Sequence, residues 1–281
     1  MRVVASSFGS AGDFLPTLAI AAVLQRRGHD VRFVANPAYT DRLQLAGLNV
    51  IPAGAPVDVG AKIEQNPGYG DFSHAGKMLE DLVAPHIEAT YRVVSDILRS
   101  TAIDVVLTND ARYGALWAAA EAHVPSVLVH PSPMFWMSWR DPVVIGLPLP
   151  TVLARPVTVA MRGLLDWYMT RFLRGVARRV CTPLPDVSFR GSERMAAIRL
   201  GLWSPLLRGP MASDPPNGGI CGYARASGLE CPTLPPPRSI PSSRRIRRRS
   251  SSASDPSTRV GRRGRFSPSP RRAATSAVGV S

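Results

Sequence analysis

Short apolar runs and longer helical patterns alternate along the first 130 residues of the chain. The apolar runs are continuous, which is typical of strands that helices cover on both faces of a sheet. Two of the helical patterns end at a glycine, a residue that is common just past the last helical turn. The alternation predicts an α/β fold with a doubly wound parallel sheet. Strands are predicted at 2–8, 30–35, 49–52, 103–108 and 125–130, helices at 15–27, 37–46, 77–99 and 113–122, and a Gly- and Pro-rich loop at 54–72.

The remainder of the chain has two parts of different character. A long helix is predicted over 151–180, and short strands at 200–204 and 218–223 complete a domain that spans 1–225. Residues 226–281 follow, dominated by Arg, Ser and Pro and without apolar periodicity. Such a segment cannot bury enough apolar surface to offset the entropy lost on ordering. We therefore predict a disordered C-terminal tail.

The net charge of +14 comes mostly from this tail. Residues 233–281 hold 12 Arg, no Lys and one Asp, which gives +11 and leaves +3 for residues 1–232. A nucleic-acid-binding role would therefore depend on the tail alone, through electrostatic contact of arginine with phosphate. Phe266 is the one aromatic residue between 233 and 281, so the stacking of bases on aromatic rings is not supported.

Cysteine usage and hydropathy exclude several other classes. Cys181, Cys221 and Cys231 form no CxxC pair, so neither a zinc site nor a disulfide framework is indicated. The first residues lack the apolar core and cleavage site of a secretory signal. The most apolar later stretch, 142–165, contains four prolines and two arginines, which argues against a spanning helix. We expect a cytoplasmic protein without a bound metal, whose arginine-rich 151–180 helix could make peripheral contact with the inner membrane face.

A glycine-rich turn with one carboxylate, residues 9–16 (GSAGDFLP), separates the first predicted strand from the first predicted helix. The turn lies at the carboxyl edge of the sheet, which is where ligands bind in open α/β folds. Gly9 and Gly12 allow a tight turn, and Asp13 comes just before the predicted helix. Asp13 has two compatible roles on this pattern, as a helix cap and as a reactive carboxylate. The turn differs from the Gly-x-Gly-x-x-Gly pattern of dinucleotide-binding folds.

Two longer stretches resemble a known family. The segments SFGSAGDFLPTLAIAAVLQRRGHDVRFVANP and IDVVLTNDARYGALWAAAEAHVPSVLVHPSP are similar to the N-terminal, family 28-type domains of GT-B glycosyltransferases. The relatives in question are sterol and lipid glucosyltransferases and the macrolide and glycopeptide glycosyltransferases of bacteria. The resemblance covers residues 1–225 and implies a Rossmann-like, acceptor-binding domain. The matching positions are Gly9, Gly12, Asp13, Pro16, Gly28 and His29.

The resemblance implies a hexosyltransferase that moves a sugar from a UDP- or dTDP-sugar to a hydroxyl of a lipophilic acceptor, such as a sterol, glycolipid or polyketide. Asp13 matches the position of the family's general base, which takes the proton of the attacking hydroxyl. Asp110 matches a second acid of the family. Because both positions hold Asp, no His–Asp pair is available, and Asp110 is either an acceptor ligand or a helix cap. No cofactor is implied beyond the nucleotide-sugar co-substrate.

Other residues at the same edge of the sheet are predicted to bind substrate. His130 ends the fifth predicted strand and is either a substrate contact or a structural hydrogen-bonding residue. The aromatic stretch 133–139 (PMFWMSW) predicts an apolar wall for a lipophilic acceptor, and core packing explains the same residues equally well. The predicted substrate-binding set is Gly9, Gly12, Phe14, His130, Ser132, Phe135 and Trp136.

The His-Gly-Gly-x-Gly segment with which this family binds its donor has no counterpart here, because none of the five histidines precedes Gly-Gly. We therefore expect the C-terminal nucleotide-sugar domain to be absent and this chain alone to be inactive. A frameshift between residues 222 and 237 would explain both the missing domain and the composition of the tail. Two alternatives stay open. One is an acceptor-binding half of a split glycosyltransferase whose partner chain supplies the donor domain, and the other is nucleic-acid binding through the tail.

Overall fold

The computed structural model describes residues 1–45, 47–70, 75–109, 113–133, 136, 151–180, 186–212 and 214–224. The chain divides into two units, Met1–Leu234 and Pro235–Ser281, and all of the described residues belong to the first unit. The described ranges end at residue 224, so the predicted tail at 226–281 lies outside them.

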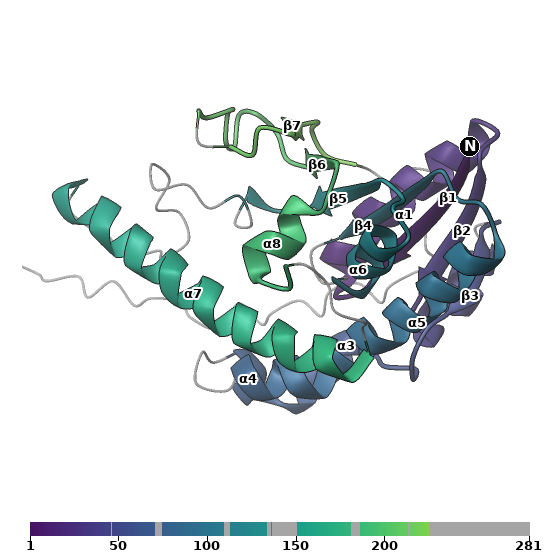
Figure 1. Ribbon diagram of the computed structural model, residues 1–281, viewed down its shortest axis with the longest axis horizontal. Coiled ribbons are helices and arrows are strands. Elements are labelled where there is room, and N and C mark those ends of the chain that lie inside the picture. Colours follow the sequence, from purple (N-terminus) through teal and green to yellow (C-terminus); the bar gives the residue numbers. More distant parts are fainter. Residues whose placement is uncertain are drawn as a thin grey trace, which may run out of the picture. The chain divides into compact units, whose positions relative to one another are not determined.

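Seven parallel strands form one sheet in the order β3-β2-β1-β4-β5-β6-β7 (Figure 1). This order reverses at β1, because β2 and β3 lie on one side of it and β4 to β7 on the other. The α/β fold with a doubly wound, Rossmann-like parallel sheet is thus confirmed. The strands are β1 Arg2–Ser7, β2 Asp30–Ala35, β3 Asn49–Pro52, β4 Val105–Asn109, β5 Ser126–His130, β6 Ile198–Gly201 and β7 Gly218–Ile220.

Helices connect the strands and cover both faces of the sheet. Two short 3-10 helices, Pro37–Tyr39 and Pro67–Gly70, and a π-helical stretch, Leu79–Val83, interrupt the regular α-helical segments. In the part of the chain that the structure describes, no helix is long and apolar enough to cross a membrane. The α-helices are α1 Ala11–Arg26, α2 Thr40–Leu45, α3 Val59–Gln65, α4 Ala75–Met78, α5 Ala84–Ser100, α6 Tyr113–Glu121, α7 Thr151–Val180 and α8 Phe189–Arg194.

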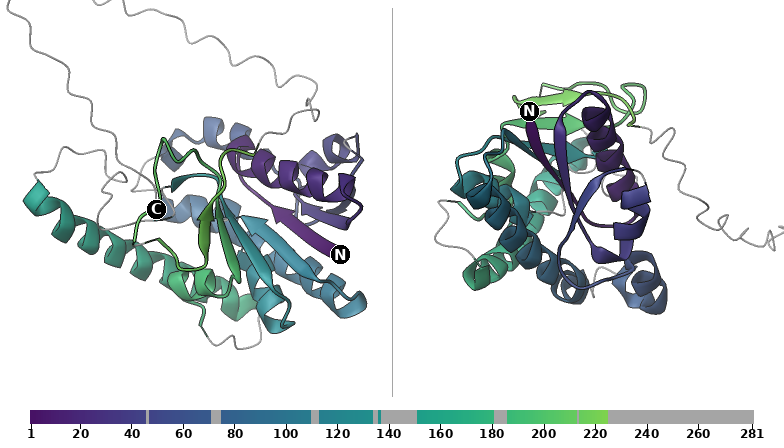
Figure 2. Two further views of the ribbon diagram at one scale, coloured as in Figure 1. Left: turned by 90° about the horizontal axis from the view of Figure 1, so that it is seen from above. Right: turned by 90° about the vertical axis from the view of Figure 1, so that its right-hand side faces the viewer.

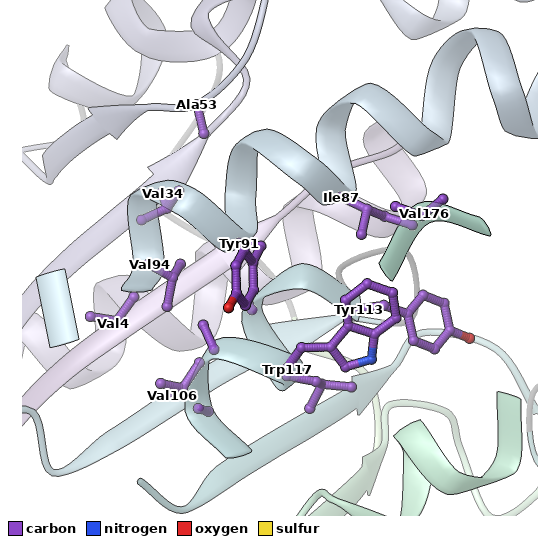
Figure 3. Packing of buried hydrophobic residues seen from close by; sticks show 14 of the residues in the cluster. Val4, Val34, Ala53, Ile87, Tyr91, Val94, Val106, Tyr113, Trp117 and Val176 are labelled. Atoms are coloured by element: carbon purple, nitrogen blue, oxygen red, sulfur yellow. The ribbon is translucent and has the colours of Figure 1, made fainter. Parts of the chain in front are cut away.

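Two hydrophobic clusters lie on opposite faces of the sheet, because successive side chains of a strand point to opposite faces. In β1, Val3 packs in the cluster that contains Phe14 of α1. Val4 packs in the other cluster, with Ile87 of α5 and Trp117 of α6. Figure 2 shows α1, in purple, on one side of the strands and the blue and teal helices α5 and α6 on the other. Figure 3 shows this second cluster from close by.

Several predicted boundaries were wrong. Helix α1 begins at Ala11 rather than at residue 15, so Asp13 lies inside its first turn and not before it. The predicted loop 54–72 contains helix α3. The predicted strand 200–204 is β6 at Ile198–Gly201, and the helix expected to end just before it, near Met195, is α8 at Phe189–Arg194.

Candidate functional site

The turn after β1 and the end of β4 meet where the strand order reverses. Ser7 ends β1 and Asn109 ends β4, and both strands end at the carboxyl edge of the sheet. In open α/β sheets, the crevice outside the carboxyl ends of the strands at such a reversal is the usual ligand site. The predicted edge is therefore the place to look for functional groups.

Asp13 is held in the first turn of α1 by the residue that caps this helix. Its Oδ2 accepts hydrogen bonds from the Ser10 backbone N–H at 3.0 Å and from the Ser10 hydroxyl at 2.9 Å. A carboxylate in the first helical turn also interacts favourably with the positive end of the helix dipole. Asp13 is half-buried, and its Oδ1 makes no hydrogen bond among the described residues. The carboxylate thus has one oxygen fixed by the fold and the other left to accept a hydrogen bond.

Gly9 is required by the position of this carboxylate. Its φ is +123°, a backbone region that is costly for any residue with a side chain. A Cβ at this position would lie 2.5 Å from Oδ2 of Asp13. At Gly12, by contrast, a Cβ would meet only Ser10 Oγ, at an ordinary 3.6 Å. Steric contact therefore requires glycine at position 9 and not at position 12.

Asn109 fastens the carboxyl ends of two strands to the first turn of α1. Its side-chain amide donates to Ser7 Oγ at 3.1 Å, to the Phe8 carbonyl at 3.0 Å and to the Asp13 carbonyl at 3.3 Å. The side chain is buried, with 1% of its surface exposed. Sequence reasoning chose the neighbouring Asp110 and missed Asn109, because nothing in the sequence links this amide to a turn about one hundred residues earlier. Asn109 positions the backbone that carries Asp13.

Replacement of Asn109 by leucine, which is similar in size, is expected to destabilise the domain by about 1–3 kcal/mol. The reason is that the hydrogen bonds from this buried amide to the Ser7 hydroxyl and to the Phe8 and Asp13 carbonyls would be lost. Denaturant unfolding measures the change in free energy. Asn66→Leu is the control, because this amide is exposed at the end of α3 and, among the described residues, donates only to the nearby Lys62 carbonyl. Equal stability of the two variants would contradict the role of Asn109.

The predicted residue His130 lies in a buried aromatic group. Its ring is fully buried and meets Trp136 edge-on, with ring centroids 5.8 Å apart. Trp136 in turn meets Trp203 edge-on at 5.0 Å. Ser132, just beyond β5, is half-buried. Since His130 and Trp136 pack against one another inside the structure, their role in substrate binding stays a prediction.

Phe14 also packs in the core. Its ring stacks on Tyr39 with centroids 5.0 Å apart and meets Phe33 edge-on, and only 7% of the residue is exposed. The structure therefore separates Phe14 from Asp13, although the two are adjacent in sequence. Its role in substrate binding stays a prediction as well. Asp110 and Phe135 lie outside the described residues.

Among the described residues, no group of three or more His, Cys, Asp or Glu side chains is arranged to hold a metal ion. The candidate site thus consists of the segment Gly9–Asp13, in which Ser10 caps the helix, and of Asn109, whose amide donates hydrogen bonds to this segment.

The fold is a Rossmann-like α/β domain with a carboxylate in the first turn of the helix after β1. Residues 3–130 match the model of the family described as glycosyltransferase family 28 N-terminal domain. The resemblance to a GT-B glycosyltransferase N-terminal domain is therefore confirmed.

Proteins that are named as glycosyltransferases match the chain over a larger region. An uncharacterized glycosyltransferase of Mycobacterium tuberculosis is 29% identical over 205 residues, which cover 70% of this chain and 47% of that protein. The 3-alpha-mycarosylerythronolide B desosaminyl transferase of Saccharopolyspora erythraea is 29% identical over 164 residues, 58% of this chain and 34% of that protein. The solved glycosyltransferase SnogD of Streptomyces nogalater is 18% identical with a TM-score of 0.48, over 79% of this chain and 51% of that one. The chain spans about half the length, or less, of the curated relatives that it matches.

Proposed function

We propose that this chain supplies the acceptor side of a glycosyltransferase, with Asp13 as the general base. The reaction is transfer of the sugar of a nucleoside diphosphate sugar to a hydroxyl of a lipophilic acceptor. The observation that carries the proposal is the carboxylate of Asp13, held through Oδ2 by Ser10 at the carboxyl edge of a family 28 N-terminal domain. A base whose second oxygen is open to a substrate hydroxyl meets the geometric requirement for proton abstraction.

In the proposed step, the acceptor hydroxyl donates a hydrogen bond to Oδ1 of Asp13. The hydroxyl oxygen forms a bond to the anomeric carbon of the sugar, and its proton passes to the carboxylate. The bond from the anomeric carbon to the diphosphate oxygen breaks, and the diphosphate leaves with the electron pair. An aspartate is a weak base at neutral pH, so the rate depends on the placement of the carboxylate and on the good leaving group.

The names of two relatives support the proposed acceptor and donor classes. One relative is named as a transferase of desosamine to a mycarosylated erythronolide, which is a polyketide. A shorter match, 39% identical over 62 residues, is named as a dTDP-epi-vancosaminyltransferase. These names favour a polyketide-like acceptor over a sterol and a dTDP-sugar over a UDP-sugar for this chain.

The proposal is tested with the full chain in two steps. First, binding of a macrolactone, an aromatic polyketide and a sterol is measured by equilibrium dialysis. We expect a dissociation constant of about 1 µM–1 mM, the usual range of KM values, for at least one polyketide. Second, the chain is incubated with dTDP- and UDP-sugars, alone and with the separately produced donor-side half of the Mycobacterium tuberculosis relative. A mass gain of one sugar on the acceptor reports transfer.

Each result of this test has a defined meaning. Transfer that needs both halves supports the proposal and the dependence on a donor-side partner. Acceptor binding without transfer in any mixture would favour a non-catalytic acceptor-binding protein. The proposal is wrong if no acceptor binds and no product forms.

A further inference from the structure

A concave region lies away from Asp13, between α7, α8 and the loop that leads into β7. It is a cavity of about 480 Å³, a size typical of small-molecule sites. Its lining includes Arg199 of β6 and Asn217 just before β7. In the sheet order, β6 is three strands away from β1, or roughly 14 Å at the usual strand spacing. The cavity is thus separate from the turn that holds Asp13.

Positive charge exceeds negative charge on the wall of this cavity. Four arginines line it, against the two carboxylates Glu193 and Asp214. The carboxylates already have arginine partners. Glu193 pairs with Arg199 at 3.2 Å, and Asp214 with the buried Arg208. The lining arginines are Arg162, Arg190, Arg194 and Arg199.

Arg162 is the arginine of this lining that has no ion-pair partner among the described residues. Arg190 pairs with Asp166 at 3.7 Å, and Arg194 pairs with Asp186 at 2.9 Å. Within the described ranges, the guanidinium of Arg162 takes part in no hydrogen bond and no ion pair. Burial lowers the pKa of Arg162, and the nearby Arg190 lowers it further. The carboxylates of Glu193 and Asp166 act in the opposite direction without cancelling these effects. An added anion would offset the cost of this half-buried charge.

The rest of the wall is apolar and aromatic. Leu165 of α7, Phe189 of α8 and Trp136 line the cavity, together with Pro215 and Pro216. Trp136 is fixed by its edge-on contact with Trp203 and by close packing over Gly218, where a Cβ would lie 2.7 Å from the indole ring. The cavity therefore combines an unmatched guanidinium with a rigid apolar surface.

We propose that this cavity binds an organic anion that carries one carboxylate or phosphate group on an apolar body. The oxyanion pairs with Arg162, whose planar guanidinium presents two parallel donors to such a group. The apolar body packs against Leu165, Phe189 and Trp136. This site is independent of the transfer proposed at Asp13.

The test uses the full chain and isothermal titration calorimetry with three small probes. Benzoate and phenyl phosphate carry the two candidate head groups, and benzamide is their neutral analogue. We expect one or both anions to bind at least about 10-fold more tightly than benzamide, since a hydrogen bond to a charged group contributes about 1.5–3 kcal/mol. The stronger of the two anions identifies the head group.

Three variants tie the binding to the cavity. Arg162→Gln is expected to weaken anion binding by about 10–100-fold. The matched control is Arg171→Gln, an exposed arginine of the same helix that does not line the cavity, and it should bind as the wild type does. Leu165→Trp fills the apolar part and should abolish binding. Unchanged binding by Arg162→Gln, equal binding of benzamide, or no binding of either anion would each overturn the proposal.

Discussion

Sugar transfer is expected to fall by about 10²–10⁴-fold when Asp13 is replaced by asparagine, the usual contribution of a general base. Asparagine has nearly the shape of aspartate, and its amide oxygen can still accept from the Ser10 backbone and hydroxyl as Oδ2 does now. The other carboxylate oxygen, Oδ1, is replaced by an NH2 group, which cannot take the proton of the acceptor hydroxyl. The free energy of unfolding should therefore change by about 1 kcal/mol or less. Transfer is measured in the two-half assay and stability by denaturant unfolding.

A matched control for this substitution is Asp58→Asn. Asp58 also caps a helix, since its Oδ1 accepts from the Ala61 N–H at 3.0 Å at the start of α3. Asp58 stabilises a helix start as Asp13 does, but it lies at α3 and not at the helix that follows β1. The Asp58→Asn variant should therefore keep full transfer. If Asp13→Asn also keeps full transfer while acceptor binding is retained, Asp13 is only a cap and the base lies elsewhere.

Replacement of Gly114 by alanine is expected to cost about 3 kcal/mol or more, because α6 and α5 are in direct backbone contact there. A Cβ on Gly114 would overlap the carbonyl oxygen of Ile87 and lie 2.8 Å from the backbone nitrogen of Tyr91. Neither atom can move without separating the two helices, whose side chains form the cluster in Figure 3. The expected fall in melting temperature is roughly 6–12 °C for a domain of this size.

The same substitution at Gly163 should have the opposite sign. Gly163 lies inside α7, where a Cβ would have no neighbour within 4 Å. Alanine favours a helix over glycine by about 1 kcal/mol, so Gly163→Ala should be neutral or stabilising. Thermal unfolding of both variants checks the pair. A Gly114→Ala variant as stable as the wild type would show that α5 and α6 are not packed as closely as described.

The strands could be predicted well because their signal is local. Runs such as VVASS in β1 and VVLTN in β4 are buried on both faces, and each is bounded by a turn or a polar residue. The start of α1 was harder, since Gly12 and Pro16 are poor helix formers, and the prediction began the helix at residue 15, three residues after Gly12. The Ser10–Asp13 cap outweighs these residues in the structure. Asp13 itself was found from the turn pattern and from the family resemblance.

Groups that come together only through the fold could not be predicted. Asn109 is bonded to the turn that begins at Gly9, about one hundred residues earlier in the chain. The cavity beside Arg162 draws its wall from α7, α8 and the loop before β7, and no spacing in the sequence links them. The aromatic stretch 133–139 predicted Trp136 as an acceptor contact, and its packing between His130 and Trp203 could not be read from the sequence.

The two outermost strands of the sheet bear on how the protein behaves at high concentration. An outer strand exposes backbone groups that another chain can pair with, which is a common start of aggregation. Here the outer strands are β3, with four residues of which the last is Pro52, and β7, with three residues. Proline has no N–H to donate, and three residues make few hydrogen bonds. These short outer strands offer a second copy of the sheet few backbone groups to pair with, so they disfavour edge-to-edge association.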